Sequence, residues 1–121
     1  MTVIFYDSVE APSSTTSTSW VDHVSKSGNL NAQKHWLWVY AEYGGTLTNR
    51  NVAIRVTVNG SEVAFDYHEP SESGEYKAFN MMGEIDVPVD DSPYTVVLQY
   101  VSQHSSQTAL IRRVRLMLMQ E

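Results

Sequence analysis

The side chains that could perform catalysis or bind a metal are scattered along this sequence. Asp66, His68 and Glu69 offer three oxygen or nitrogen ligands within four residues. In an extended segment, however, Asp66 and His68 share a face while Glu69 points away, so we interpret this segment as the polar end of a strand. The histidines are too far apart for the short H-x-x-x-H spacing of zinc sites. They are His23, His35, His68 and His104.

The acidic residues do not form a recognisable catalytic motif either. Asp86, Asp90 and Asp91 do not follow the EF-hand pattern and are interpreted as a solvated turn. Glu72 and Glu75 lie in a polar loop, and a sequence does not show the separation across a cleft that defines a glycosidase pair. The chain has no G-x-S-x-G nucleophile elbow and no Walker loop. We therefore predict a protein that is not an enzyme and that uses no cofactor and no metal ion.

Composition excludes further classes of protein. None of the 121 residues is cysteine, which rules out disulfides, thiolate catalysis and Cys-type zinc sites. Eight Lys and Arg against fourteen Asp and Glu give a formal net charge of −6, which argues against a nucleic-acid partner. The segment 1–7 has no basic start, and no later run reaches the ~20 apolar residues of a membrane span. We expect neither a secretory signal nor a membrane partner.

The spacing of apolar residues predicts an all-β fold. Apolar side chains occupy every second position in segments 52–58 and 63–67, and Asn59-Gly60 lies between the two runs. This pattern predicts a β-hairpin over about 51–67, because both residues of the turn must accept a positive φ. Gly44-Gly45 is interpreted as a loop signal. Further strands are predicted at 2–7, 19–25, 35–43, 75–81, 83–87, 94–102 and 108–119.

These strands predict one domain, residues 1–121, built as a two-sheet antiparallel sandwich of about eight strands. Immunoglobulin-type sandwiches and jelly rolls both fit, although the Cys…Trp…Cys framework of the former is absent. Strong strands at both ends of the chain favour the jelly roll. Segment 8–19 is rich in Ser and Thr and is predicted to be a surface loop, with a glycosylated stalk as the alternative.

Two strands raise the question of an exposed apolar surface. Alternation along the last strand places five residues on one face: Ile111, Arg113, Arg115, Met117 and Met119. Met and Arg are favoured at protein interfaces, so this face is a candidate interface unless the monomer covers both sides of the strand. Trp36, Trp38 and Tyr40 also alternate, and they could line the core, a sugar-binding platform or a contact between subunits.

The C-terminal third carries a resemblance to a known group of proteins. Segment 94–100 (YTVVLQY), a short polar loop and segment 107–116 (QTALIRRVRL) resemble small virion proteins of tailed bacteriophages, in which a Y-T-V-x-L-Q-Y strand precedes a T-A-x-I-R-x-x-R-L terminal strand. The hairpin R-V-x-V-N-G-x-x-V (55–63) and the Ser/Thr run that closes on Ser19-Trp20-Val21 fit the same design.

The resemblance implies a jelly roll that works as a capsid decoration, or cement, protein. Such a protein would sit on the outer surface of the capsid as a homotrimer assembled in the host cytoplasm, and would stabilise the phage head by bridging subunits of the major capsid protein. Val3 and Phe5 of the first strand would then help to pair with a partner's free edge. The alternative is a carbohydrate- or receptor-binding module of a phage tail, with Trp36 and Trp38 stacking on a sugar.

Overall fold

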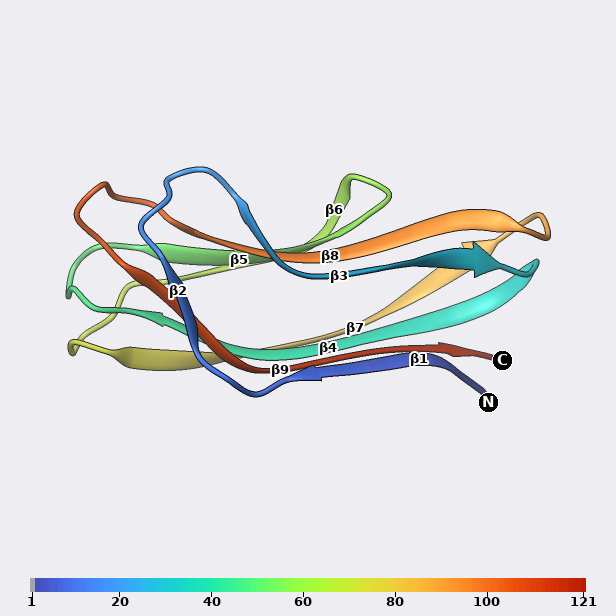
Figure 1. Cartoon of the computed structure of the whole chain (residues 1–121), viewed down its shortest axis with the longest axis horizontal. Helices are drawn as coiled ribbons and strands as arrows, with labels where there is room; N and C mark the ends of the chain where they lie inside the picture. Colours follow the sequence, from blue (N-terminus) through green and yellow to red (C-terminus); the bar gives the residue numbers. More distant parts are fainter. Residues whose placement is uncertain (1) are drawn as a thin grey trace.

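A computed structural model describes residues 2–121 as nine β-strands, with no helix in that range that could span a membrane. The strands form two antiparallel sheets stacked face to face (Figure 1). The first sheet has the order β1-β9-β4-β7, with β2 also paired to β9, and consists of β1 (Thr2–Val9), β2 (Ser13–Thr15), β4 (Gln33–Gly45), β7 (Glu75–Val87) and β9 (Ala109–Gln120). The second has the order β3-β8-β5-β6 and consists of β3 (Val21–Leu30), β5 (Val52–Val58), β6 (Ser61–His68) and β8 (Ser92–Ser102). The predicted all-β sandwich is confirmed, and the first and last strands pair with each other.

The core lies between the inner rows of the two sheets. On β4 every second residue from Leu37 to Tyr43 is buried, and on β8 the same holds from Tyr94 to Tyr100. These rows follow from the twofold alternation of side chains along a strand, so a continuous apolar layer forms where the sheets face each other. On β9 four side chains are 0% exposed: Ile111, Val114, Leu116 and Leu118.

The predicted hairpin is formed by β5 and β6. Asn59 and Gly60 both have positive φ, 50° and 82°, as a two-residue turn of this kind requires. The apolar row of β6 faces outward, however, and leaves Val63, Phe65 and Tyr67 exposed. A register shift in the β5–β6 pairing determines that these side chains point outward.

Gly44-Gly45 is not a loop, which corrects the prediction. Both residues belong to the end of β4, where they pair with the start of β7. A Cβ on Gly44 would lie 2.0 Å from the carbonyl oxygen of Glu75, and one on Gly45 would lie 2.5 Å from the Gln107 side chain. Glycine is therefore needed here for close approach within a strand and not for a turn.

Two other element boundaries differ from the prediction. Segment 8–19 is largely exposed but is not a single loop, because β1 continues to Val9 and Ser13–Thr15 forms β2 against β9. The two strands expected at 75–81 and 83–87 are one strand, β7, whose pairing with β4 runs without a register shift.

A β-bulge in β9 changes which side chains point inward. Tyr40 pairs with Arg115 and Glu42 with Arg112, so β9 has one extra residue here, and Arg113 adopts a φ of 52°. Ile111 lies before the bulge and is 0% exposed. The prediction that Ile111 shares the outer face with the arginines and methionines is therefore wrong.

Polar groups close the two open sides of the sandwich. The Lys26 ammonium lies 3.5 Å from Asp7 between β3 and β1. On the other side, Asp66 accepts a 2.6 Å hydrogen bond from the Tyr43 hydroxyl and pairs with Lys77 at 3.0 Å. Burial raises the pKa of Tyr43. Burial by itself would raise the pKa of Asp66 as well, but the hydrogen bonds from Tyr43 and Lys77 outweigh it and lower that pKa.

Candidate functional site: the outer face of the five-stranded sheet

Apolar side chains from four strands meet on the outer face of the five-stranded sheet. The register aligns one row across β1, β9, β4 and β7 as Val3, Met119, Trp36 and Glu84. The next row aligns Tyr6, Met117, Trp38 and Met82. We call the apolar members of these rows the Met–Trp face: Val3, Tyr6, Trp36, Trp38, Met82, Met117 and Met119.

Exposure across this face is greatest at the two borders of the sheet. Tyr6 on β1 is 52% exposed and Met82 on β7 is 60% exposed, while Trp38 and Met117 between them are partly buried by their neighbours. None of the described strands or loops packs over these rows. A contiguous apolar patch of this kind is a candidate interaction surface.

Polar contacts hold the two indoles differently. The Trp38 Nε1 donates a 2.8 Å hydrogen bond to Asn80 on the neighbouring strand β7. The Trp36 Nε1 is buried and has no hydrogen-bond partner among the described residues, and the Lys34 ammonium lies 6.0 Å from the centre of that ring. Trp38 is thus fixed by a hydrogen bond, whereas Trp36 is held by packing.

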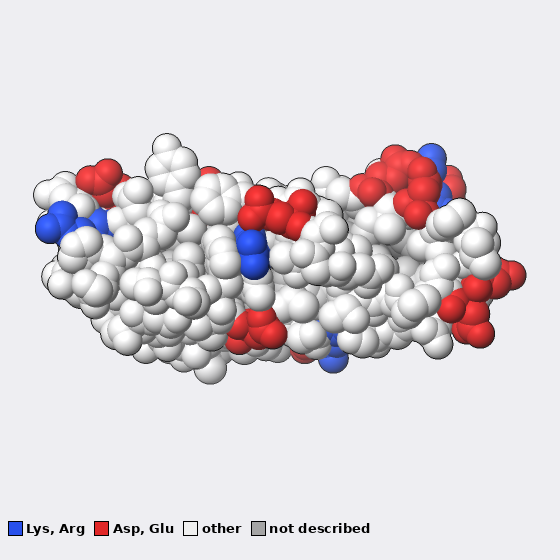
Figure 2. Space-filling view, turned by 90° about the horizontal axis from the view of Figure 1, so that it is seen from above, with Lys and Arg blue, Asp and Glu red and all other residues white. Residues whose placement is uncertain are grey.

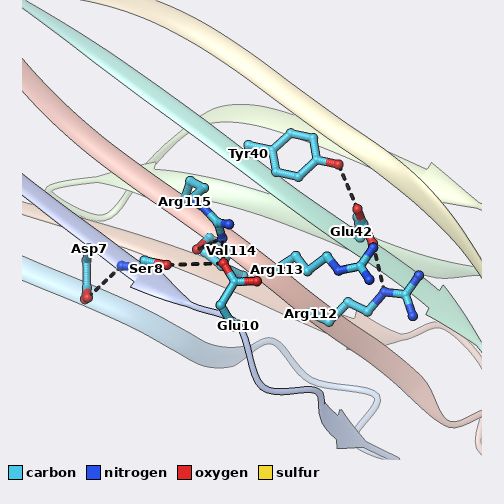
Figure 3. Close-up of polar contacts among 9 residues, drawn as sticks. All are labelled: Asp7, Ser8, Glu10, Tyr40, Glu42, Arg112, Arg113, Val114 and Arg115. Carbon is cyan, nitrogen blue, oxygen red and sulfur yellow. Dashed lines mark hydrogen bonds and ion pairs between the residues drawn. The ribbon is translucent and has the colours of Figure 1, made fainter.

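An arginine–glutamate network borders the Met–Trp face (Figure 3). Glu42 accepts hydrogen bonds from Arg112 Nε at 2.8 Å and Arg113 Nη1 at 3.2 Å, and its other oxygen accepts one from the Tyr40 hydroxyl at 2.8 Å. The hydrogen bond from Arg112 is the main reason that the pKa of Glu42 is lowered. One carboxylate therefore serves two guanidinium groups, and the exposed Arg113 is free to make further contacts.

Further contacts extend this network to both sides. The Arg112 guanidinium stacks on Tyr76 of β7, 3.7 Å from the ring centre. Arg115 pairs with Glu10 just after β1, and Ser8 donates a hydrogen bond to the same carboxylate (Figure 3). The network thus spans the whole width of the sheet, next to the apolar rows.

The structure brings together residues that the sequence assigned to different roles. Met117 and Met119, predicted as an interface, lie beside Trp38 and Trp36, predicted as a sugar platform. Val3 is on the same face, and Arg113 and Arg115 border it.

Phe5 does not belong to this face, which is a second correction. A register shift between Val3 and Phe5 places Phe5 opposite the inward-facing Leu118, and Phe5 packs against the core. Tyr6 and Met82 were missed. The alternation on β7 could have indicated that Met82 lies on this face. The face on which Tyr6 lies depends on the register shift between Val3 and Phe5, so alternation could not have indicated it.

The outer face of the four-stranded sheet carries a second aromatic group. The Arg55 guanidinium lies 4.4 Å from the centre of the Trp20 ring, and Trp20 meets Phe65 edge to face at 6.2 Å. Arg55 also donates to Gln99, and Gln99 donates to Asp22, each at 2.7 Å. Figure 2 looks onto this sheet and shows a surface that is mostly uncharged, with one basic group between acidic groups near its middle.

The dispersed titratable residues do not converge. The described residues contain no group of three or more His, Asp and Glu side chains placed to hold a metal ion. His68 lies 3.2 Å from Glu75 and Asp66 is engaged by Tyr43, so these side chains make structural contacts between β6 and its neighbours. Hydrogen bonds from Ser71 lower the pKa of Glu75.

Comparison with known proteins identifies the architecture. The sequence matches no protein-family model and no curated protein. The VP2 protein of the infectious bursal disease virus subviral particle aligns with a TM-score of 0.54 at 8% identity, over 97% of this chain and 36% of VP2. The CBM36-1 domain of a xylanase from the hindgut metagenome of Trinervitermes trinervoides aligns with a TM-score of 0.53 at 9% identity, over 93% of this chain and 96% of that domain. The Bacillus thuringiensis toxin Cry8Ea1 aligns with a TM-score of 0.55 at 15% identity, over 89% of this chain but only 19% of the toxin.

At these identities the likeness establishes the fold alone. The neighbours are jelly-roll-type β-sandwich domains, and they include a viral capsid protein and a carbohydrate-binding module. The chain is accordingly a jelly-roll-type β-sandwich, an architecture that suits a structural or binding module.

Proposed function

We propose that the chain is a non-enzymatic structural protein of a virion, a decoration module that binds the outside of an assembled capsid. Its partners are further copies of itself, in a homotrimer, and the major capsid protein. The observation that carries this proposal is the Met–Trp face, an uncovered apolar surface that reaches from one border of the five-stranded sheet to the other.

The composition of this face fits a protein interface. Trp, Tyr, Met and Arg are the residue types enriched where proteins meet, and charged residues are depleted at the centre of such contacts. Here Trp38 and Met117 lie centrally, Glu42 and the arginines lie along one side, and Glu84 lies at the β7 border, paired with Lys34. An apolar centre with a hydrogen-bonding rim is the arrangement expected of a contact that excludes water.

Two further facts support a place in a virion. A capsid protein shares this fold, and segments 94–100 and 107–116 resemble strands of small phage virion proteins. These segments form β8 and most of β9, and β9 carries Met117 and Met119. The absence of cysteine suits a particle assembled in a reducing cytoplasm.

The test compares the mass of the purified protein with that of charged variants. The wild-type protein is expected to sediment as an oligomer, and Met117→Glu/Met119→Glu is expected to sediment as a monomer and to lose binding to empty capsid shells. The matched control is Val63→Glu/Phe65→Glu, which adds the same charge to exposed positions on the other sheet. Because the methionines are partly buried, Met82→Glu at a 60% exposed position is the second test of the same face. A folded Met82→Glu variant with unchanged mass and unchanged capsid binding would overturn the proposal.

The second candidate function is carbohydrate binding at Trp38. The hydrogen bond that Trp38 donates to Asn80 fixes this indole on an open sheet face, and fixed aromatic rings of this kind stack on sugar rings. A carbohydrate-binding module has the same fold over nearly its whole length. Saturable binding on a glycan array that is lost in Trp38→Ala, together with a monomeric wild-type protein, would favour this function over the first.

A further inference from the structure

The five-stranded sheet has two free borders. Among the described residues, β1 pairs only with β9 and β7 pairs only with β4. Each border strand therefore presents a row of backbone N–H and C=O groups without a strand partner. Such a row is a template for pairing with another strand unless the protein protects it.

These two borders are poorly protected. Strand β7 contains no proline, its pairing with β4 has no register shift, and the run Ala78–Gly83 carries no charge. On β1 the run Thr2–Tyr6 is also uncharged, and it contains one register shift, between Val3 and Phe5. Charged residues, short length, proline and bulges are the usual means of blocking a free border, and on β7 the charged residues are confined to the two ends of the strand.

The borders of the other sheet differ in this respect. Strand β3 carries Asp22 and Lys26 and a register shift after Asp22, and β6 carries Glu62 and Asp66. The longest uncharged runs on these strands are therefore only 27–30 on β3 and 63–65 on β6. The borders with the longer uncharged runs belong to the sheet that carries the Met–Trp face.

The two uncharged runs lie at the same level of the sheet. The register carries Tyr6 on β1 through Met117 and Trp38 to Met82 on β7. Each of the three pairings that link β1 to β7 is antiparallel, so β1 and β7 run in opposite directions. A second copy rotated about an axis parallel to the strands therefore brings its β1 antiparallel to β7 of the first copy (Figure 1).

We infer that β1 of one copy pairs with β7 of the next, so that the five-stranded sheet continues from protomer to protomer. The side chains with the highest exposure on the Met–Trp face, Val3, Tyr6 and Met82, lie on these two borders. Pairing places Met82 of one copy beside Tyr6 of the next, which continues that apolar row across the contact, and it places Glu84 beside Val3 in the adjacent row. This inference rests on the proposed function and names the contact by which the copies assemble.

The contact is head to tail, because it joins two different strands. Contacts of this type close into rings when the rotation between copies is a simple fraction of a turn, and a trimer is such a ring. A contact between two β7 strands would instead give a twofold dimer. The experiment must therefore distinguish β1–β7 pairing from β7–β7 pairing.

Cysteine cross-linking tests the contact directly, because the natural chain has no cysteine. Tyr6→Cys and Met82→Cys place one thiol on each border. Within one chain these positions are three strand spacings apart, about 14 Å, which is too far for a disulfide. With oxidised glutathione as the oxidant, an equal mixture of the two single variants is expected to give a covalent dimer. The double variant Tyr6→Cys/Met82→Cys is expected to give a ladder that ends at the mass of the closed ring.

The outcomes separate this inference from the proposed function. Cross-linking of Met82→Cys alone as efficiently as the mixture would replace the inferred contact by a β7–β7 contact. The wild-type protein could instead form an oligomer that depends on Met117 and Met119 but gives no β1–β7 cross-link, even when Asn80→Cys or Glu84→Cys replaces Met82→Cys. That result would overturn the inference and leave the proposed function standing. A monomeric wild-type protein without any cross-link would overturn both. The control pair is Tyr6→Cys with Val63→Cys on the other sheet, which is expected to give no dimer.

Discussion

Gln107 gives the sharpest quantitative prediction about this fold. Its side chain is 0% exposed and lies between the end of β4 and the start of β9, the two central strands of the Met–Trp face. The amide nitrogen donates to the carbonyl oxygens of Leu47 at 2.8 Å and Arg50 at 2.7 Å. The amide oxygen accepts from the backbone N–H groups of Leu47 at 2.8 Å and Thr108 at 3.1 Å. One side chain therefore satisfies the backbone of two chain segments.

The substitution Gln107→Glu keeps the acceptor and removes the donor. At pH 7 the new carboxylate loses two hydrogen bonds, about 1 kcal/mol each, and turns an oxygen toward two carbonyl oxygens. We expect a total loss of about 3 kcal/mol in the free energy of unfolding. A buried carboxylate that faces carbonyls has its pKa raised above the unfolded value of about 4.3, and a difference of about 2 kcal/mol between the ionised and the protonated form corresponds to a rise of about 1.5 units. Because the folded pKa is raised, the variant is most stable below pH ~4 and loses stability as the pH rises through ~6.

The assay is urea unfolding at pH 4 and pH 7, with each variant compared with the wild-type protein at the same pH. The protonated glutamic acid can donate to one of the two carbonyls, so we expect the deficit to shrink to about 1 kcal/mol at pH 4. Gln107→Leu has the same volume class and no titratable group, so its deficit should not depend on pH. Gln103→Glu, an exposed position in the same loop, is the matched control and should be close to neutral. An equal deficit for Gln107→Glu at both pH values would refute the assignment of its amide as the donor to Leu47 and Arg50.

Two further predictions concern other parts of the sheet. Gly44→Ala should destabilise the protein by about 2–3 kcal/mol, because the new Cβ would lie 2.0 Å from the Glu75 carbonyl oxygen. Gly28→Ala is the control and should be neutral or slightly stabilising, because a Cβ on Gly28 would meet only open space. Thermal unfolding of the two variants checks this prediction. The lowered pKa of Glu42 implies stability that is present above pH ~4.5 and is lost as the pH falls through the folded value. Glu42→Gln should therefore reduce by about 0.5 kcal/mol the loss in free energy of unfolding as the pH falls, a small effect because Arg112 and Arg113 are partly exposed. An unchanged dependence of stability on acid pH would contradict the proposed charge pairing.

Much of the fold was predictable because it depends on local rules. The hairpin of β5 and β6 was found from Asn59-Gly60 and the alternation beside it, since few residues tolerate two successive positive φ angles. Strands β4 and β8 were found from twofold alternation alone, and their inner rows are buried as expected. The extent of β7 and the placement of Gly44 depended on contacts with chain segments that are distant in the sequence, and such contacts leave no local pattern.

The outer surface was predicted less well because alternation fixes a face only until the first bulge. Strict alternation from Val3 would place Phe5 outside, yet a register shift turns Phe5 toward Leu118. Neither this shift in β1 nor the bulge in β9 contains a glycine that would indicate it in the sequence. The β9 bulge falls on Arg113, a residue type that rarely takes positive φ, and its guanidinium is held by Glu42 on the neighbouring strand. A tertiary contact thus accompanies a local conformation that the sequence does not favour.

The β9 bulge is also the reason that the Met–Trp face exists. Ala109 and Ile111 point into the core before the bulge. If β9 paired regularly through Arg113, the same alternation would turn Met117 and Met119 inward and Leu116 outward. With the bulge at Arg113, the methionines lie on the same face as the tryptophans of β4, and the arginines lie beside Glu42. The apolar rows and their charged rim therefore both depend on the bulge. Deleting Arg113 would remove the bulge but keep Val114, Leu116 and Leu118 on the inner face, because twofold alternation from Ile111 then reaches them directly.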